Sequence, residues 1–155
     1  MRLVDMGYKN ILEKLPYTKP FLFVDEIVAL SDDGISGHFT FREDSDFYRG
    51  HFKNNPVTPG VILTECCAQI GLVCLGIHLV EQRYDLTVGD MKIGLSSSEM
   101  EFYLPVFPNE KVTVTSKIDY FRFQKLKCQV KMHNSKGQLV CKGLIAGMLK
   151  VEKNA

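Results

Sequence analysis

The sequence predicts an α+β fold in which one antiparallel β-sheet wraps around a single long helix. Residues 61–80 are almost wholly apolar, and as a helix they would extend over ~30 Å. Six segments rich in aromatic and β-branched residues flank this stretch, two before it and four after it. A sheet that turns one face towards the helix would bury it on nearly all sides, which explains why the helix has no polar face.

A short helix and a hairpin are expected at the N-terminus. Residues 8–15 have the amphipathic pattern of a helix that ends at Pro16. Residues 21–30 and 35–42 are predicted strands. The Ser-Asp-Asp-Gly turn at 31–34 predicts that these two strands pair with each other.

The long helix follows an irregular segment, residues 44–58. Thr58 is a suitable N-cap, and Pro59 suits the first helical position, where the missing N–H of proline costs nothing. The helix is expected to continue to about Arg83. Four further strands, separated by turns with proline, asparagine or glycine, are predicted at 89–103, 110–122, 124–134 and 138–151.

One domain over residues 1–155 accommodates all of these elements, and no repeat or linker divides the chain. The formal net charge of +1 provides no global field that would favour nucleic acid or an anionic membrane as a partner. The N-terminus lacks the apolar run of a secretory signal. Three polar residues inside the long apolar stretch favour a helix buried in a globular protein over a membrane span; they are Glu65, Gln69 and His78.

The cysteines indicate a reducing compartment. Their number is odd, they lie in apolar stretches, and none of them has the spacing of a zinc finger or ribbon. We therefore expect buried free thiols, no metal site and a cytoplasmic protein. The five are Cys66, Cys67, Cys74, Cys128 and Cys141.

Glu65 is the functional candidate that the residue types indicate most directly. It would lie on the second turn of an otherwise apolar helix, where burial of an ionised carboxylate is unfavourable and raises its pKa. A structural alternative is a carboxylate at an edge, or paired with Arg49 or Arg83. Gln69, one turn further on, could orient the Glu65 carboxyl group or only satisfy a backbone group.

His51 and Gly60 could supply the other parts of an acid–base site. His51 follows a glycine in the segment that leads into the helix, and an imidazole is suited to proton abstraction near neutral pH. Gly60 would lie in the first helical turn, where N–H groups lack intrahelical partners and the helix dipole favours negative charge. The alternative for Gly60 is a purely packing role. With Glu65, these residues would provide a base, an acid and an oxyanion donor for an enolate.

Four motifs occur in one order along the chain. They are Leu-Pro-Tyr-Thr-Lys-Pro-Phe-Leu-Phe-Val-Asp at 15–25, Gly-His-Phe-Lys-Asn-Asn-Pro-Val-Thr-Pro-Gly-Val at 50–61, Glu-Cys-Cys-Ala-Gln at 65–69 and Pro-Val-Phe-Pro-Asn-Glu at 105–110. Together they resemble the β-hydroxyacyl-acyl-carrier-protein dehydratases of the FabZ type. In that family the patterns are L-P-x-x-x-P-F-L-x-V-D, G-H-F-P-x-x-P-x-M-P-G-V, E-x-x-A-Q and P-V-x-P-G-D. The resemblance covers nearly the whole chain.

The resemblance implies a hotdog fold and dehydration of a (3R)-3-hydroxyacyl thioester on acyl carrier protein to the trans-2-enoyl thioester. It implies a homodimer, which often assembles into a trimer of dimers, with His51 as base and Glu65 as acid from different protomers. It further implies that the Gly60 amide binds the thioester carbonyl oxygen and that the Val57 carbonyl accepts a hydrogen bond from the His51 ring. No metal or redox cofactor is implied, because the substrate arrives on phosphopantetheine.

The same resemblance suggests an apolar tunnel for the acyl chain, lined by residues such as Phe52 and Ile62. The chain departs from the family at Lys53, where proline is usual, and at Thr58, where methionine is usual. Residues 96–104 also lack the basic residues that help to dock the carrier. Docking could instead use basic residues elsewhere in the chain, namely Arg49, Lys53, Arg122, Lys125 and Lys127. The alternative for these residues is a solvated surface with no role in docking.

These departures suit a dedicated carrier in polyene or pigment synthesis as well as they suit fatty-acid synthesis. Glu rather than Asp at position 65 resembles the simple dehydratases more than the isomerising branch. Three other functions fit part of the pattern. A hotdog thioesterase would use a carboxylate on the central helix and would not require the Gly-His-Phe segment. A non-catalytic acyl-binding subunit, or a structural dimer module, would use neither His51 nor Glu65 for catalysis.

Overall fold

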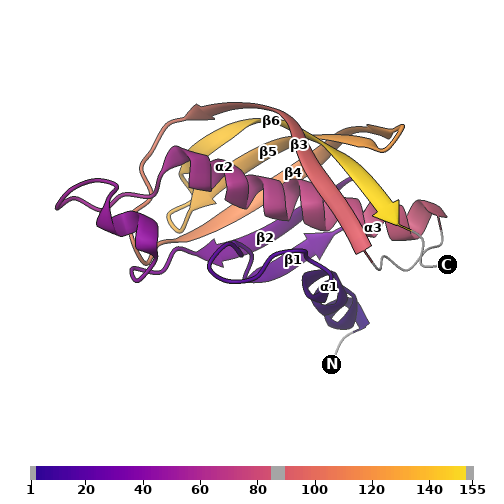
Figure 1. Cartoon of the computed structure of the whole chain (residues 1–155), viewed down its shortest axis with the longest axis horizontal. Helices are drawn as coiled ribbons and strands as arrows, with labels where there is room; N and C mark the ends of the chain where they lie inside the picture. The colour runs from indigo at the N-terminus through magenta and orange to yellow at the C-terminus, as the bar shows by residue number, and fades with distance from the viewer. Residues whose placement is uncertain (1–2, 85–89, 153–155) are drawn as a thin grey trace.

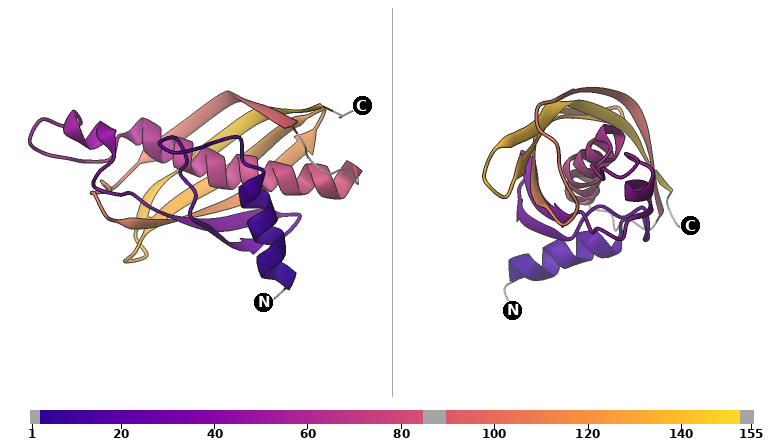
Figure 2. Two further views of the ribbon diagram at one scale, coloured as in Figure 1. Left: turned by 60° about the horizontal axis from the view of Figure 1, so that its bottom comes forward. Right: turned by 90° about the vertical axis from the view of Figure 1, so that its left-hand side faces the viewer.

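A six-stranded antiparallel sheet wraps around one long helix (Figure 1; Figure 2). The computed structural model describes residues 3–84 and 90–152. The helical segments are α1 (Leu3–Glu13), η1 (Asp46–Arg49), α2 (Gly60–Ala68), η2 (Gln69–Cys74) and α3 (Leu75–Tyr84). The strands are β1 (Glu26–Leu30), β2 (Gly34–Thr40), β3 (Asp90–Phe102), β4 (Lys111–Arg122), β5 (Lys125–Asn134) and β6 (Leu139–Glu152). The predicted fold class is confirmed.

The sheet has the strand order β1-β2-β4-β5-β6-β3, which leaves β1 and β3 at its edges. Strands β2, β4 and β5 alternate buried residues with half-buried or exposed ones, as expected for a sheet with one face on a core. The right-hand view of Figure 2 shows the sheet curling around the helix, with α1 outside the curl. Among the strands that the structure describes, edge strand β3 pairs only with β6, and it passes over the long helix.

The long helix is continuous from Gly60 to Tyr84 but contains a π-helical segment, η2, in its middle. All six residues of η2 are buried. A Cβ atom on Gly71 would lie only 2.9 Å from Val130 Cγ1, and the Ser116 hydroxyl donates a 2.9 Å hydrogen bond to the Gly71 carbonyl. The helix therefore packs closely on the sheet at a widened turn, a feature that is frequent at functional sites.

Two local predictions near the helix were wrong. The strand predicted at 21–30 begins only at Glu26, because the Phe23 N–H bonds to the side chain of Gln69 instead of another strand. Thr58 is not the N-cap: Pro59 holds that position, the helix begins at Gly60, and the Thr58 hydroxyl lies 2.6 Å from that of Tyr48.

The other bounds are close to the prediction. Strand β2 and the four C-terminal strands agree with the predicted ranges within two residues at each end. The N-terminal helix spans Leu3–Glu13 instead of 8–15, so it starts five residues earlier and ends before Pro16.

The apolar stretch at 61–80 lies inside the sheet, as predicted. Gly60–Arg83 is long and apolar enough to cross a membrane by length and composition, with a mean hydropathy of 1.9. However, 72% of the 18-residue window with this mean hydropathy is buried within the protein. All five cysteines are buried free thiols, as expected.

Candidate active site

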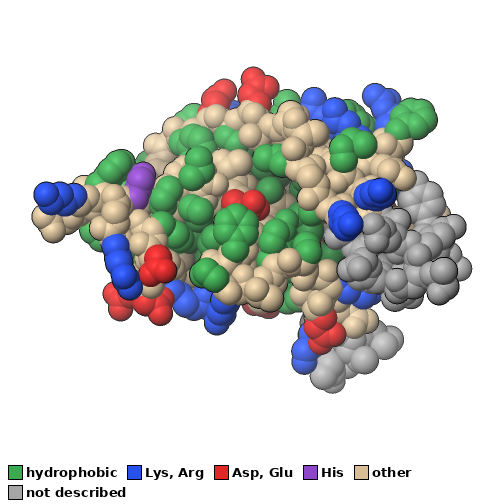
Figure 3. All heavy atoms as spheres, in the orientation of Figure 1, with side chains coloured by type: hydrophobic (Ala, Val, Ile, Leu, Met, Phe, Trp, Pro, Cys, Tyr) green, Lys and Arg blue, Asp and Glu red, His purple; other side chains and the backbone are tan. Residues whose placement is uncertain are grey.

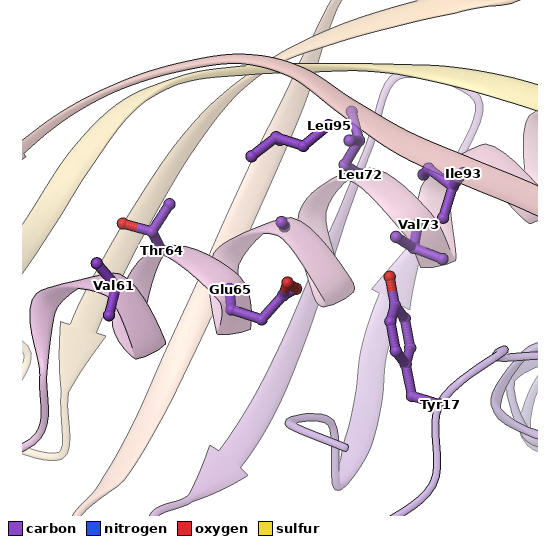
Figure 4. Close-up of a pocket in the computed structure, with 9 residues that line it drawn as sticks. Tyr17, Val61, Thr64, Glu65, Leu72, Val73, Ile93 and Leu95 are labelled. Atoms are coloured by element: carbon purple, nitrogen blue, oxygen red, sulfur yellow. The ribbon is translucent and has the colours of Figure 1, made fainter. Parts of the chain in front are cut away.

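A cavity of about 280 Å³ opens between α2, the extended segment before β1 and edge strand β3 (Figure 4). Most of its lining is apolar, and α2 and η2 supply more than half of it. Only three of its residues have polar side chains: Tyr17, Thr64 and Glu65. The complete lining is Tyr17, Val61, Thr64, Glu65, Ala68, Leu72, Val73, Ile93 and Leu95.

Glu65 is a half-buried carboxylate in this apolar setting. Burial raises the pKa of Glu65 above its usual value, and the hydrogen bond from Gln69 opposes that rise only in part. The arginines considered as ion-pair partners are engaged elsewhere: Arg49 contacts Asp46, and Arg83 donates to the Phe121 carbonyl. Within the described residues Glu65 forms no ion pair. A half-buried carboxyl group with a raised pKa is frequent at functional sites.

Gln69 is fully buried and connects Glu65 to the segment before β1. Its Nε2 lies 3.4 Å from Glu65 Oε2 and donates a 3.0 Å hydrogen bond to the Phe21 carbonyl. Its Oε1 accepts a 2.8 Å hydrogen bond from the Phe23 N–H. One amide therefore contacts the Glu65 carboxyl group and also satisfies two backbone groups.

Replacement of Gln69 by Met is expected to lower the free energy of unfolding by about 2–4 kcal/mol, because the backbone groups of Phe21 and Phe23 lose their partners. Chemical denaturation would measure this loss. The exposed Gln82, on α3, provides the matched control, and Gln82→Met should change stability by less than about 0.5 kcal/mol. Equal stability of the two variants would contradict the bridging function of Gln69.

His51 is half-buried and held in one orientation. Its Nδ1 lies 2.8 Å from the Val57 carbonyl oxygen, and its ring stacks on Phe52 with 3.9 Å between the ring centroids. The His51 N–H bonds to the Phe47 carbonyl, and the Val57 N–H bonds to the His51 carbonyl. Because a carbonyl oxygen only accepts, Nδ1 carries a proton and Nε2 of the neutral ring has a free lone pair.

Gly60 begins the long helix, five residues before Glu65 and ~7.5 Å from it along the axis. Its N–H belongs to the first turn and has no partner within the helix. The Phe102 ring lies 3.4 Å from the place where a Cβ atom would be, so a larger side chain would press on that ring. The Gly60 N–H therefore lies at the helix N-terminus, about one turn and a half before Glu65, although Gly60 itself is not among the residues that line the Glu65 cavity.

One chain does not bring all of the predicted residues together. His51 is not among the residues that line the Glu65 cavity, and Phe52 is 56% exposed. Ile62 lines a second cavity, of about 430 Å³, with the 19–23 and 44–47 segments. Tyr17 lines the Glu65 cavity although the sequence analysis did not single it out. The sequence signal for this residue was a polar aromatic side chain at a variable position of the motif that begins with Leu15-Pro16.

Comparison with known proteins identifies the family of this chain. The model of the FabA-like domain family matches residues 15–147. The 3-hydroxyacyl-[acyl-carrier-protein] dehydratase FabZ of Ehrlichia ruminantium (strain Gardel) is 33% identical over 129 residues, which are 78% of this chain and 85% of that protein.

Solved structures show the same fold at low sequence identity. A chain of the dehydratase heterocomplex ApeI:P from Xenorhabdus doucetiae has a TM-score of 0.75 at 11% identity, with 92% of this chain and 91% of that chain covered. A hypothetical thioesterase protein with coenzyme A from Streptococcus pneumoniae TIGR4 has a TM-score of 0.60 at 12% identity, with 83% and 88% covered. The fold is therefore the hotdog fold.

The fold defines the class of protein as a hotdog-fold protein, with a half-buried carboxyl group on its central helix. The matched family model and the FabZ relative show that the chain belongs to the FabA-like family, as a dehydratase of the FabZ type.

Proposed function

We propose that this protein dehydrates a (3R)-3-hydroxyacyl thioester on acyl carrier protein, in fatty-acid or related polyene or pigment synthesis. The site combines His51 of one protomer with Glu65 of its partner in a homodimer. The observation that carries this proposal is the half-buried Glu65 in an apolar cavity, with a pKa raised by burial. A carboxyl group that retains its proton at higher pH is suited to act as the acid of an elimination.

Support for a shared site comes from the edge of the sheet beside the cavity. Strand β3 has only β6 as a neighbour, so the backbone groups along its other side are available to another strand. Apolar side chains near this edge are exposed: Val61 by 77%, Leu95 by 56% and Phe102 by 48%. Figure 3 shows hydrophobic side chains across the middle of this face, with one acidic group among them. Pairing with a second copy would cover this surface.

Such a dimer would also supply the base. The segment that carries His51 projects at the N-terminal end of the long helix, whereas Glu65 lies within the cavity further along it (Figure 1). A second copy placed against β3 can bring its own His51 to the cavity of the first. By the family resemblance, three such dimers form the larger assembly.

The proposed mechanism is a balanced elimination. Nε2 of His51 removes a proton from C2, and the Gly60 N–H at the helix N-terminus stabilises the negative charge on the thioester oxygen. The C2–H bond and the C3–O bond break, the C2=C3 double bond forms, and Glu65 protonates the departing hydroxyl group to give water. The Val57 carbonyl keeps Nδ1 protonated, and Gln69 orients Glu65. Proton exchange with solvent restores both groups, so no metal or redox cofactor enters the reaction.

The acyl chain would lie against the apolar wall of the cavity, formed by Leu72, Val73, Ile93 and Leu95, with Phe52 of the partner protomer at its mouth. Ile62, on the other side of the helix, could line an extension of the tunnel through the second cavity. The substrate would be delivered on phosphopantetheine. The five buried free thiols support a reducing, cytoplasmic compartment.

The acidic carrier protein would dock on basic residues of the dimer. The candidates form two separate sets within one chain: Arg49 and Lys53 lie near the His51 segment, while Arg122, Lys125 and Lys127 lie on the β4–β5 hairpin. Figure 1 shows these two regions at opposite ends of the long helix. The set near His51 is closer to the proposed base, so we assign initial docking to Arg49 and Lys53.

Product analysis tests the proposed function. The protein would be incubated with 3-hydroxyacyl thioesters of graded length on acyl carrier protein and on coenzyme A, and enoyl thioester and free thiol would be measured separately. Formation of enoyl thioester without thiol release is expected. Thiol release without enoyl product would instead identify a thioesterase, an activity consistent with the fold shared with the Streptococcus pneumoniae protein. Tight binding without turnover would identify an acyl-binding subunit.

A further inference from the structure

Tyr17 is the second ionisable side chain of the cavity that contains Glu65. It lies in the extended segment between α1 and β1, shortly before the stretch that Gln69 holds against the helix. Figure 4 shows its hydroxyl group directed at the helix, towards the space into which the Glu65 carboxyl group also points. The Tyr17 ring packs on Phe21, with 6.2 Å between the ring centroids. The position of the hydroxyl group is therefore set by packing.

The hydrogen bonds in the cavity leave the Tyr17 hydroxyl without a protein partner. The Thr64 hydroxyl donates a hydrogen bond to the Gly60 carbonyl, and the Glu65 carboxyl group accepts one from the Gln69 amide. Among the residues that the structure describes, no group forms a hydrogen bond with the Tyr17 hydroxyl. A phenol that lies in an apolar cavity is usually hydrogen-bonded. The free donor is thus placed to meet a ligand oxygen.

Electrostatics keep this donor in its protonated form. Burial, and then the charge of Glu65, raise the pKa of Tyr17 to about 12. The phenol is therefore neutral across the physiological range and donates a hydrogen bond. It differs in this respect from Glu65, which has to give up its proton during the proposed reaction.

We propose that Tyr17 donates a hydrogen bond to the 3-hydroxyl oxygen of the acyl substrate and thereby selects substrates that carry this group. The inference rests on the proposed function and extends it to a residue outside the acid–base pair. The thioester oxygen is assigned to the Gly60 amide, at the beginning of the helix. Tyr17 faces the other end of the cavity, near Glu65 and Val73, where the oxygen that leaves from C3 would lie.

Tyr17→Phe provides the test, because it removes one oxygen and keeps the ring that packs on Phe21. Binding would be measured in the His51→Ala background, where the substrate is not consumed. The Kd of the 3-hydroxyacyl thioester is expected to rise about fivefold to tenfold, as for the loss of one neutral hydrogen bond. The Kd of the saturated acyl thioester of equal length should not change. Tyr120→Phe, on β4, is the matched control and should change neither Kd.

Steady-state kinetics of Tyr17→Phe in the protein that retains His51 provide an independent test. The equilibrium constant of the reaction is fixed, so Tyr17→Phe must lower kcat/KM equally for dehydration and for hydration. The loss should occur as a higher KM for the 3-hydroxyacyl thioester but as a lower kcat for the enoyl thioester, which lacks the hydroxyl group. Equal weakening of the hydroxylated and saturated ligands, or no change in either, would overturn the proposal. Absence of turnover by the unmodified protein would overturn the proposed function instead, and the binding comparison would still test Tyr17.

Discussion

Replacement of His51 by Ala is expected to lower kcat/KM for dehydration by about a thousandfold, as for the loss of a positioned general base. The hydrogen bond between Nδ1 and the Val57 carbonyl leaves Nε2 as the nitrogen that can accept a proton in the proposed reaction. The variant should still fold, because the replacement removes one half-buried hydrogen bond with a net contribution of about 1 kcal/mol.

Steady-state kinetics with a 3-hydroxyacyl thioester would measure the loss, and thermal unfolding would verify the fold. His133, on β5, is a matched control, and His133→Ala should retain full activity. Full activity of His51→Ala would exclude His51 as the base. That result would mean that another group removes the C2 proton.

Replacement of Glu65 by Gln is expected to lower kcat/KM by a similar factor, about a thousandfold. The amide has the shape of the carboxyl group but has no acidic proton to give to the departing hydroxyl. The loss should occur mainly in kcat, because the shape of the cavity is unchanged. Glu26→Gln, at an exposed position of β1, is the control and should retain activity.

The same replacement is expected to stabilise the fold at high pH. Burial raises the pKa of Glu65, so its ionisation opposes folding, and stability is lost as the pH rises through the raised value. Gln is neutral at every pH. Thermal unfolding should show a higher Tm for Glu65→Gln than for the unmodified protein at pH 8, and the difference should disappear below the usual carboxyl pKa of 4.5. A lower Tm at pH 8 would mean that the fold stabilises the carboxylate.

Local patterns in the sequence predicted the fold well, and tertiary contacts account for the errors. The C-terminal strands follow from apolar alternation and from turn residues, which act over short distances. Thr58 has the residue type of an N-cap, but its hydroxyl is engaged by Tyr48. The segment before β1 resembles a strand, but a glutamine side chain 46 residues away binds the Phe23 N–H. Neither contact leaves a local signal.

The candidate site was predictable only in part. Glu65 stands out because a carboxyl group is unexpected on an apolar helix, where burial raises its pKa. The case for His51 depends on the resemblance to a family, since a histidine in a loop is not unusual. For Tyr17 the residue type at a variable motif position was a weak signal, because its proximity to Glu65 arises from the path of the chain around the helix.

The shared site is the central claim, and mixing the two inactive variants tests it most directly. Subunits of His51→Ala and Glu65→Gln would be exchanged, and the fraction of mixed dimers would be measured with distinguishable tags. If each site takes His51 from one protomer and Glu65 from the other, every mixed dimer contains one intact site. An equal mixture should then recover about a quarter of the unmodified activity. Mixed dimers that form but remain as inactive as the parent variants would contradict the shared site.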